Sequence, residues 1–293
     1  MNKIEPNHPD FCNLINADAE IEIISENHQF TEGPVWDESH QRLLFSDIPA
    51  NKIYSWSEKD GVDVYYQPSN FSNGLALDSS GNLIICEHRG RAISSLNGDK
   101  KRIVLADQFT GYKLNSPNDL VIGHDGSIIF TDPIYGLREG NGGPAQQELP
   151  FQGVFRIEPH SLELTLITDT FERPNGLAIS PDQKNLFIVD TVEQHIRKFN
   201  IGENWTFSGG EVWASLWDED VVGRPDGIKF DRHGNLFSTG PGGIWIFSPR
   251  AELLGRIYLP DKTSNINWGM QDNKTLFITS SDKVYRLQCL TGA

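Results

Sequence analysis

The sequence predicts an all-β fold, a six-bladed β-propeller whose ring is closed by an N-terminal strand added to the last blade. Three observations predict it: one short motif returns six times, strand-like runs follow each copy, and no segment keeps a 3.6-residue apolar period. The 293 residues are then expected to form a single domain, 1–293, with an N-terminal extension over 1–18 and the propeller over about 19–290.

Each copy of the motif begins with a polar residue, continues with glycine or another small residue, and then alternates apolar positions. Clear copies start at Asn73, Asn118, Asn175 and Asp226, and weaker copies start at Glu32 and Asn267. From Glu32 the copies are spaced by 41, 45, 57, 51 and 41 residues. A four-stranded propeller blade takes roughly 40–50 residues, so six copies predict six blades.

The strand signals inside the repeats agree with this count. After Asn175, residues 186–189, 195–199 and 211–213 are expected to form the second, third and outer strands, with Pro181-Asp182 and Gly202 as breakers. The last repeat offers only three strands, at 267–270, 275–279 and 283–287. Residues 21–24 have strand composition and are expected to supply the fourth, which leaves no open sheet edge.

Composition narrows the possible functions. The net charge of -15, from 40 acidic and 25 basic residues, disfavours binding to nucleic acid and to anionic membranes. No run approaches the ~18 apolar residues of a membrane helix, and the N-terminus lacks the apolar core of a signal peptide, so a cytoplasmic location is expected. Cys12, Cys86 and Cys289 are too few for a disulfide framework or a Cys-based zinc site.

The first residues of the six repeats are the candidates for chemistry. The first strand of each propeller blade lines the central channel, so the side chains that begin these strands are expected to converge. They are Glu32, Asn73, Asn118, Asn175, Asp226 and Asn267. Two carboxylates and several amide oxygens suit a hard dication such as calcium.

For any single Asn or Asp, turn capping is the simpler interpretation. Taken as a set, the six positions favour a metal-binding site. Glu is a poor turn former, and yet Glu32 occupies the equivalent position in the first repeat. Proline also precedes Asn118, Asn175 and Asp226, which restricts the backbone at each.

Four motifs carry a resemblance to a known family. They are Glu32-Gly33-Pro34-Val35-Trp36, Ser116-Pro117-Asn118-Asp119, Arg173-Pro174-Asn175-Gly176-Leu177 and Arg224-Pro225-Asp226-Gly227. From about Glu32 to the C-terminus the chain resembles the gluconolactonase family, which includes senescence marker protein (regucalcin), and more distantly diisopropylfluorophosphatase and paraoxonase. The resemblance implies that Glu32, Asn175 and Asp226 are metal ligands, that Asn118 is a ligand or substrate contact, and that Asp226 is also the catalytic carboxylate. Many members with small sugar-acid substrates have Arg where this chain has Ser116.

The predicted function is a metal-dependent lactonase that opens the ester ring of a sugar-type lactone. One divalent cation is expected, calcium first, with zinc, manganese, magnesium and iron left open. It would polarise the carbonyl while Asp226 accepts a proton from water. A phosphotriesterase-like hydrolase and a non-enzymatic calcium-binding propeller are the alternatives. The expected partner is a small-molecule lactone, and the oligomeric state stays open.

Polar residues also end the second strands, which antiparallel pairing returns to the same face. Turn capping is the preferred interpretation of Asp47 and Asp190. The candidate substrate contacts are Asn73, His88, Asn118, Asp132 and Tyr135. The long Gly-rich segment 134–152 is interpreted as a lid or rim that shapes substrate choice, because loops of this length are uncommon without a function.

Overall fold

The computed structural model describes residues 3–293, which form six antiparallel sheets of the propeller type. The predicted six-bladed β-propeller is confirmed. The chain divides into two compact units, residues 32–175 and residues 3–31 with 176–293, and three sheets fall mainly in each. The organisation as one domain stays a prediction.

The first unit carries the first three blades, in which consecutive strands pair as neighbours. Blade one is β3 (Thr31–Asp37), β4 (Arg42–Asp47), β5 (Lys52–Ser57) and β6 (Gly61–Tyr66); blade two is β7 (Ser72–Leu77), β8 (Leu83–Glu87), β9 (Ala92–Leu96) and β10 (Arg102–Ala106); blade three is β13 (Leu120–Ile122), β14 (Ile128–Asp132), β15 (Gly153–Ile157) and β16 (Leu164–Thr168). The hairpin β11 (Gln108–Phe109) and β12 (Tyr112–Lys113) and the 3-10 turns η2 (Glu38–His40) and η3 (Tyr135–Leu137) complete the unit.

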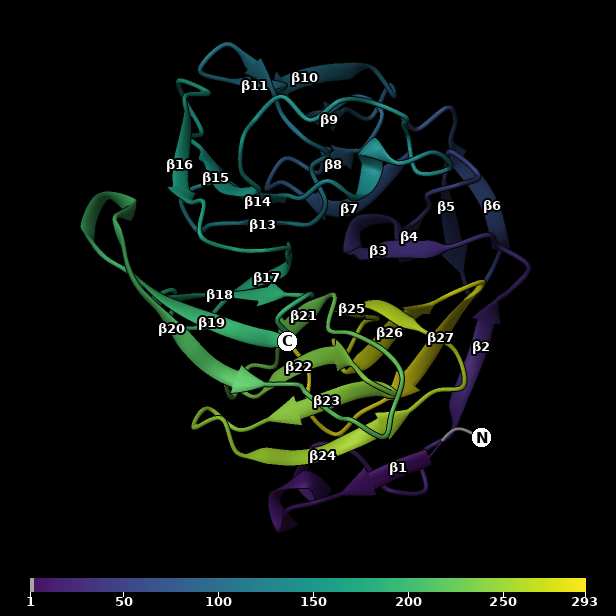
Figure 1. The fold of residues 1–293 in the computed structure, drawn as a ribbon. Helices are drawn as coiled ribbons and strands as arrows, with labels where there is room; N and C mark the ends of the chain where they lie inside the picture. The colour runs from purple at the N-terminus through teal and green to yellow at the C-terminus, as the bar shows by residue number, and fades with distance from the viewer. Residues whose placement is uncertain (1–2) are drawn as a thin grey trace. The chain divides into compact units, whose positions relative to one another are not determined.

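The second unit carries the other three blades. Blade four is β17 (Pro174–Ile179), β18 (Asn185–Asp190), β19 (His195–Ile201) and β20 (Phe207–Ser215); blade five is β21 (Ile228–Phe230), β22 (Leu236–Gly240), β23 (Gly243–Phe247) and β24 (Leu253–Tyr258); blade six is β25 (Thr263–Gly269), β26 (Thr275–Ser280) and β27 (Lys283–Gln288). The 3-10 turn η4 (Glu203–Trp205) follows β19. As expected, an N-terminal strand completes blade six: β2 (Ile21–Ser25) pairs antiparallel with β27, Ile21 opposite Leu287 (Figure 1).

The expected N-terminal extension is itself part of the packed structure. β1 (Lys3–Pro6) adds a fifth strand to blade five by pairing with β24 (Figure 1). The 3-10 turn η1 (Pro9–Asn13) then buries Phe11 completely, in one cluster with Leu14 and Ile15 and the apolar side chains of blades five and six. Burying a side chain of this size contributes about 1.5–3 kcal/mol. The extension therefore stabilises these two blades.

Glu87 at the end of β8 is a buried charge with a complete set of partners. Its side chain is 1% exposed and receives both ends of the Arg102 guanidinium, at 2.6 Å to each carboxylate oxygen. Ser94 Oγ and Asn70 Nδ2 donate further hydrogen bonds. The two parallel bonds of an Arg–carboxylate pair restrict its geometry as well as adding energy, and they hold the strand end that precedes His88.

We expect Arg102→Met to destabilise the protein by about 3–5 kcal/mol, because it leaves the Glu87 carboxylate buried without a counter-charge. Urea unfolding at neutral pH measures the effect. The double variant Glu87→Gln/Arg102→Met should recover a large part of the loss. A single-variant loss below about 1 kcal/mol, the level of an exposed ion pair, would contradict this account of the pair.

Candidate functional site

The repeat motif contains glycine because neighbouring first strands approach each other closely at that position. A Cβ added at Gly33 would lie 2.2 Å from the Asn73 carbonyl oxygen, and one at Gly74 would lie 2.7 Å from the Asn118 carbonyl oxygen. Gly74 N–H also donates to that Asn118 oxygen at 2.8 Å. No side chain fits at either position, so the backbones that carry Glu32, Asn73 and Asn118 come close together in their unit.

The same hydrogen-bonded arrangement recurs in the second unit, where it shows that the predicted first motif residue of blade six was wrong. Gly176 N–H donates to Asp226 O at 3.0 Å, and Gly227 N–H donates to Ser264 O at 2.8 Å. Ser264 therefore occupies in blade six the position that the sequence pattern assigned to Asn267. A register shift between Thr263 and Asn265, in the strand pair β25–β26, places Ser264 in an irregularity of the ladder. Such a shift is invisible to a period-2 pattern.

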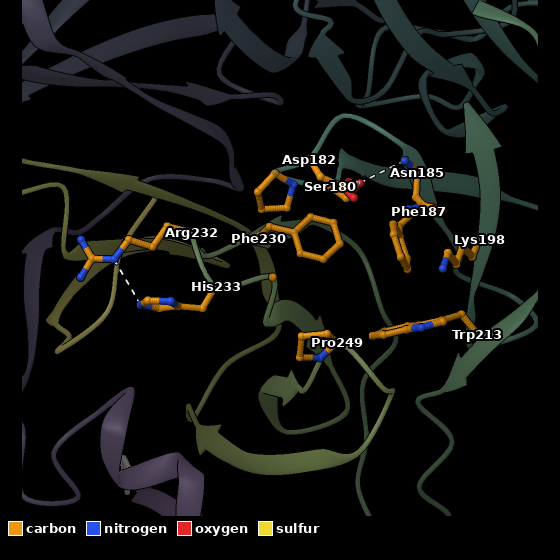
Figure 2. A pocket seen from close by; sticks show the side chains of 12 residues that line it. Ser180, Asp182, Asn185, Phe187, Lys198, Trp213, Phe230, Arg232, His233 and Pro249 are labelled. Carbon is orange, nitrogen blue, oxygen red and sulfur yellow. Dashed lines mark hydrogen bonds between the residues drawn. The ribbon is translucent and has the colours of Figure 1, made fainter. Parts of the chain in front are cut away.

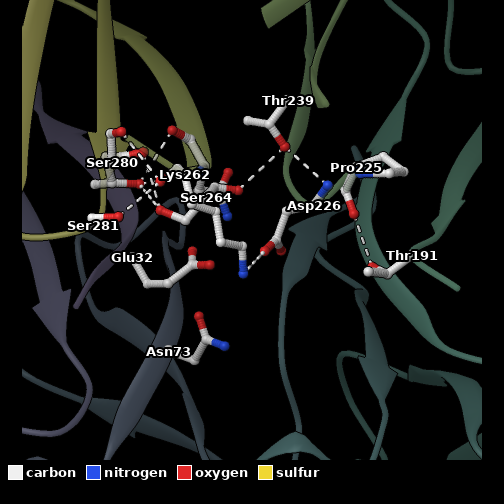
Figure 3. Close-up of polar contacts among 12 residues, drawn as sticks. Glu32, Asn73, Thr191, Pro225, Asp226, Thr239, Lys262, Ser264, Ser280 and Ser281 are labelled. Carbon is white, nitrogen blue, oxygen red and sulfur yellow. Dashed lines mark hydrogen bonds and ion pairs between the residues drawn. The ribbon is translucent and has the colours of Figure 1, made fainter. Parts of the chain in front are cut away.

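The backbone around Asp226 is held by three hydrogen bonds within its unit. Its N–H donates to Thr239 Oγ1 at 2.9 Å, and Thr191 Oγ1 donates to the carbonyl of Pro225 at 2.9 Å (Figure 3). The Asp226 carbonyl accepts the N–H of Gly176. The Asp226 side chain is 9% exposed. The backbone before β21 is therefore held in place, and the carboxylate that it carries is largely buried.

Lys262 is a neighbour of Asp226 that the sequence pattern did not reveal. Its Nζ lies 3.6 Å from Asp226 Oδ2 (Figure 3). The same Nζ lies 5.0 Å from the centre of the Phe30 ring. The lysine side chain is 51% exposed. A single charged residue in a turn is common on protein surfaces, so no sequence signal distinguishes it.

The other predicted metal ligands are all buried and belong to the first unit, of which Asn175 is the last residue. They are Glu32, Asn118 and Asn175. Glu32 Oε2 accepts the N–H of Gly33 at 3.0 Å, which aims the carboxylate relative to its own backbone. Among residues 3–293, no three His, Cys, Asp or Glu side chains gather into a group that holds a metal by themselves. The available donors are carboxylate and amide oxygens, the donor set that hard dications prefer, so the chemistry of these residues fits such an ion.

Asn73 and His88 contact each other within blade two. His88 Nε2 lies 3.2 Å from Asn73 Nδ2, and His88 Nδ1 lies 3.1 Å from the carbonyl oxygen of Asn141. Asn73 sits where the β7–β8 register shifts between Ser72 and Leu75. Its Oδ1 is buried and has no hydrogen-bond partner among residues 3–293. Buried amide oxygens are normally satisfied, so this atom is available to a ligand.

Asp132, predicted as a substrate contact, is fully buried and bound to the loop that leads to Asn118. Its Oδ2 accepts the N–H of Asn115 at 2.7 Å, and its carbonyl accepts from Asn115 Nδ2 at 2.9 Å. Burial raises the pKa of Asp132 to about 7, against the hydrogen bonds from the Asn115 and Ser116 backbone, which lower it. The direct role visible in the structure is support of residues 115–118.

We expect the stability gained by Asp132→Asn to grow as pH rises. Burial gives this carboxyl a higher pKa in the folded protein than in the unfolded chain. Its contribution to stability is therefore fully present below its ordinary pKa and is lost as pH rises towards about 7. Asn keeps an acceptor for Asn115 and cannot ionise. Between about pH 4.5 and pH 8 the difference in unfolding free energy, variant minus wild type, should increase by a few kcal/mol. Urea titrations at several pH values measure it, and a difference independent of pH would contradict the assignment.

The segment 134–152, predicted as a lid or rim, packs against blade two and the 115–118 loop. Gly136 N–H donates to Ser116 Oγ at 2.9 Å, and Ser116 Oγ donates to Pro133 O at 2.5 Å. The half-buried Tyr135 lies under Arg173, whose Cζ is 5.3 Å from the ring centre. Ser116, which departs from the family pattern, thus anchors the start of this segment.

Turn capping, the interpretation preferred for Asp190, agrees with its contacts. Its Oδ1 accepts the backbone N–H groups of Val192 and Glu193 at 3.1 and 3.2 Å. A carboxylate that closes a turn in this way needs no ligand to be satisfied.

A cavity of about 330 Å³ lies elsewhere in the second unit, between blades four and five (Figure 2). Phe187, Trp213 and Phe230 line it, with Arg232 and His233 near its rim. Arg232 and His233 follow β21, whereas Asp226 precedes it, so the cavity is at the other end of that strand. The cavity is therefore separate from Asp226.

These observations define a class of protein: a six-bladed propeller with buried carboxylates and amides at the starts of its first strands. Residues 30–282 match the family model described as SMP-30/Gluconolactonase/LRE-like region. The chain is 33% identical to the gluconolactonase of Zymomonas mobilis, over 99% of this chain and 87% of that protein. The chain therefore belongs to the SMP-30/gluconolactonase/LRE-like family, and the predicted resemblance is confirmed.

Solved structures agree with this family. A gluconolactonase of Xanthomonas campestris superposes with a TM-score of 0.92 at 33% identity, covering 98% of this chain and 94% of that one. Regucalcin of Agrobacterium tumefaciens, described as a calcium-binding protein, reaches 0.79 at 15% identity, covering 94% and 96%, and shares the fold. Regucalcin of Xenopus laevis is 24% identical over 88% of this chain and 85% of its own length. None of the helices in residues 3–293 has the length and apolarity needed to cross a bilayer.

Proposed function

We propose that this protein is a metal-dependent lactonase that opens the ester ring of a sugar-type lactone. The gluconolactonase relatives support the reaction class, since two of them are about one-third identical over nearly the whole chain. The observation in this chain that supports it best is Asp226, a buried carboxylate on a backbone held by Thr239 and Gly176.

The proposed ligands of one divalent cation are Glu32, Asn118, Asn175 and Asp226, with calcium as the first choice because all the donors are oxygens. Such an ion, when bound, supplies a Lewis acid for the lactone carbonyl. Asp226 accepts a proton from the water molecule whose oxygen attacks the carbonyl carbon. The carbonyl carbon–ring oxygen bond then breaks, the ring oxygen takes up a proton, and a hydroxy acid is released.

The predicted substrate contacts acquire different roles in this proposal. Asn73 Oδ1 is suited to accept a hydrogen bond from a sugar hydroxyl, because it is buried and has no partner among residues 3–293. Asn118 and Tyr135 remain candidate contacts. Asp132 supports the loop that carries Asn118, and His88 contacts Asn73.

Hydrolysis of glucono-, xylono- and simple aliphatic lactones tests the proposal, because each turnover releases an acid that a pH indicator detects. We expect turnover of the sugar lactones, loss of turnover with a chelator, and recovery when a divalent cation is added back. Turnover of phosphotriesters but of no lactone would instead support the phosphotriesterase alternative. Tight cation binding without any turnover would support the binding-protein alternative.

A further inference from the structure

The two ring nitrogens of His88 have different partners, and these partners determine where the ring proton lies. The side chain is 2% exposed. Nδ1 faces the carbonyl oxygen of Asn141, which only accepts, so Nδ1 must carry the hydrogen. Burial lowers the pKa of His88 to about 4, so the ring is neutral near pH 7. Nε2 then has a lone pair and must accept.

The tautomer of His88 in turn determines the orientation of the Asn73 amide. Of the two amide atoms, only Nδ2 can donate to an accepting Nε2, and the two nitrogens are 3.2 Å apart. The Asn73 oxygen is thereby directed away from the ring. This Oδ1 is the buried atom that has no hydrogen-bond partner in the described part of the chain.

The loop that provides the Asn141 carbonyl is held tightly against His88. A Cβ at Gly136 would lie 2.4 Å from His88 Cβ, and one at Gly142 would lie 2.8 Å from Arg89 N. Gly136 is also bound to Ser116 Oγ. Side chains are therefore excluded from both glycine positions, and the carbonyl of Asn141 has a defined place.

We propose that His88 is a positioning residue that acts through Asn73, so that Asn73 Oδ1 faces a hydroxyl group of the lactone. The Asn141 carbonyl selects the Nδ1–H tautomer, the tautomer orients the Asn73 amide, and the amide oxygen accepts from the substrate. This inference rests on the proposed lactonase function. It makes the 134–152 segment a determinant of substrate recognition through Asn141 and His88, in addition to the candidate contact at Tyr135.

Two substitutions of His88 separate the two halves of this relay. The amide nitrogen of Asn can replace Nδ1, so His88→Asn keeps the donor to Asn141 and loses the acceptor for Asn73. The amide of Gln reaches the place of Nε2, so His88→Gln keeps an acceptor for Asn73 and loses the loop contact. We expect His88→Asn to raise KM for a polyhydroxylated lactone by about tenfold, the cost of one hydrogen bond, and His88→Gln to stay within about twofold.

The action through Asn73 is tested by combining variants. Asn73→Ala should raise KM as much as His88→Asn, and the double variant should be no worse than Asn73→Ala alone. In His88→Asn and Asn73→Ala the ratio of KM for the polyhydroxylated lactone to KM for an unsubstituted aliphatic lactone should rise, because the aliphatic lactone offers no hydroxyl group to Asn73 Oδ1. The proposal would be overturned if the increases in KM were additive in the double variant, or if His88→Gln raised KM as much as His88→Asn. It would also be overturned if KM for the aliphatic lactone rose as much as KM for the polyhydroxylated lactone.

A measurement on the wild-type protein tests the relay without turnover. Heteronuclear NMR that correlates ring nitrogens with ring protons should show His88 as the Nδ1–H tautomer, whereas free histidine favours Nε2–H. A His88 ring protonated on Nε2 would direct the Asn73 oxygen to the ring and overturn the proposal, even if the variants fail to fold. If no lactone is hydrolysed, the lactonase function fails, and the NMR result still decides the orientation of Asn73.

Discussion

Asp226→Asn is expected to lower kcat for lactone hydrolysis by about 10²- to 10⁴-fold, the usual contribution of a general base. Asn is nearly the same size and can still accept the hydrogen bonds of the carboxylate, but it cannot take a proton from water. The backbone bonds to Thr239 and Gly176 do not involve the side chain, so the fold should persist. Stopped-flow or pH-indicator kinetics at saturating cation and lactone measure kcat directly.

The matched control is Asp220→Asn, which removes the same charge from an exposed position earlier in the same connection between β20 and β21. Its kcat should equal that of the wild type, because a distant surface charge is screened by salt. The cation content of Asp226→Asn must be measured in parallel, since the substitution also removes a proposed ligand. An Asp226→Asn protein that keeps its cation and the wild-type kcat would exclude Asp226 as the base.

The second large effect is expected on removal of the cation. Chelation should abolish lactone turnover, and Glu32→Gln should weaken cation binding by about 100-fold, because the charge of the ligand set controls affinity. At a cation concentration 100 times the wild-type Kd, the ion stabilises the wild type by about 2.7 kcal/mol and the variant by only about 0.4 kcal/mol. Thermal or urea unfolding with and without the cation gives this difference independently of activity.

The control for this experiment is Glu38→Gln in η2, directly after the far end of β3, which removes a carboxylate that accepts a hydrogen bond from Trp36 Nε1. Its cation-dependent stabilisation should match that of the wild type. If Glu32→Gln also keeps the full cation-dependent stabilisation, Glu32 is not a ligand. If chelation leaves turnover intact, the metal dependence in the proposed function is wrong.

The fold was predictable because close packing between neighbouring first strands leaves a glycine in four of the six repeats. A glycine must follow the polar residue wherever two first strands come within contact distance, as at Gly33, Gly74, Gly176 and Gly227. The missing strand of blade six was predictable by counting, and β2 supplies it. The first motif residue of blade six was not predictable. Because the strand register shifts near Ser264, the equivalent residue is Ser264, three residues before Asn267.

The candidate site was predictable only as a set of residue types. The motifs at Glu32, Asn118, Asn175 and Asp226 name oxygen donors at equivalent positions, and their roles as ligands stay predictions. The structural role of β1 and Phe11 went unrecognised, since a short polar N-terminal stretch has the composition of a tail. Lys262 also went unrecognised, because its place beside Asp226 depends on a turn.

The amino-acid sequence by itself determined the number of blades and the residue types that begin five of their first strands, because both follow from local patterns that repeat along the chain. The tertiary structure alone decided how single side chains are oriented. The amide of Asn73 is oriented by His88, and His88 by the carbonyl of Asn141, 53 residues further along the chain. Hydrogen-bond direction depends on atoms brought together by folding, and such contacts leave no period or spacing in the sequence.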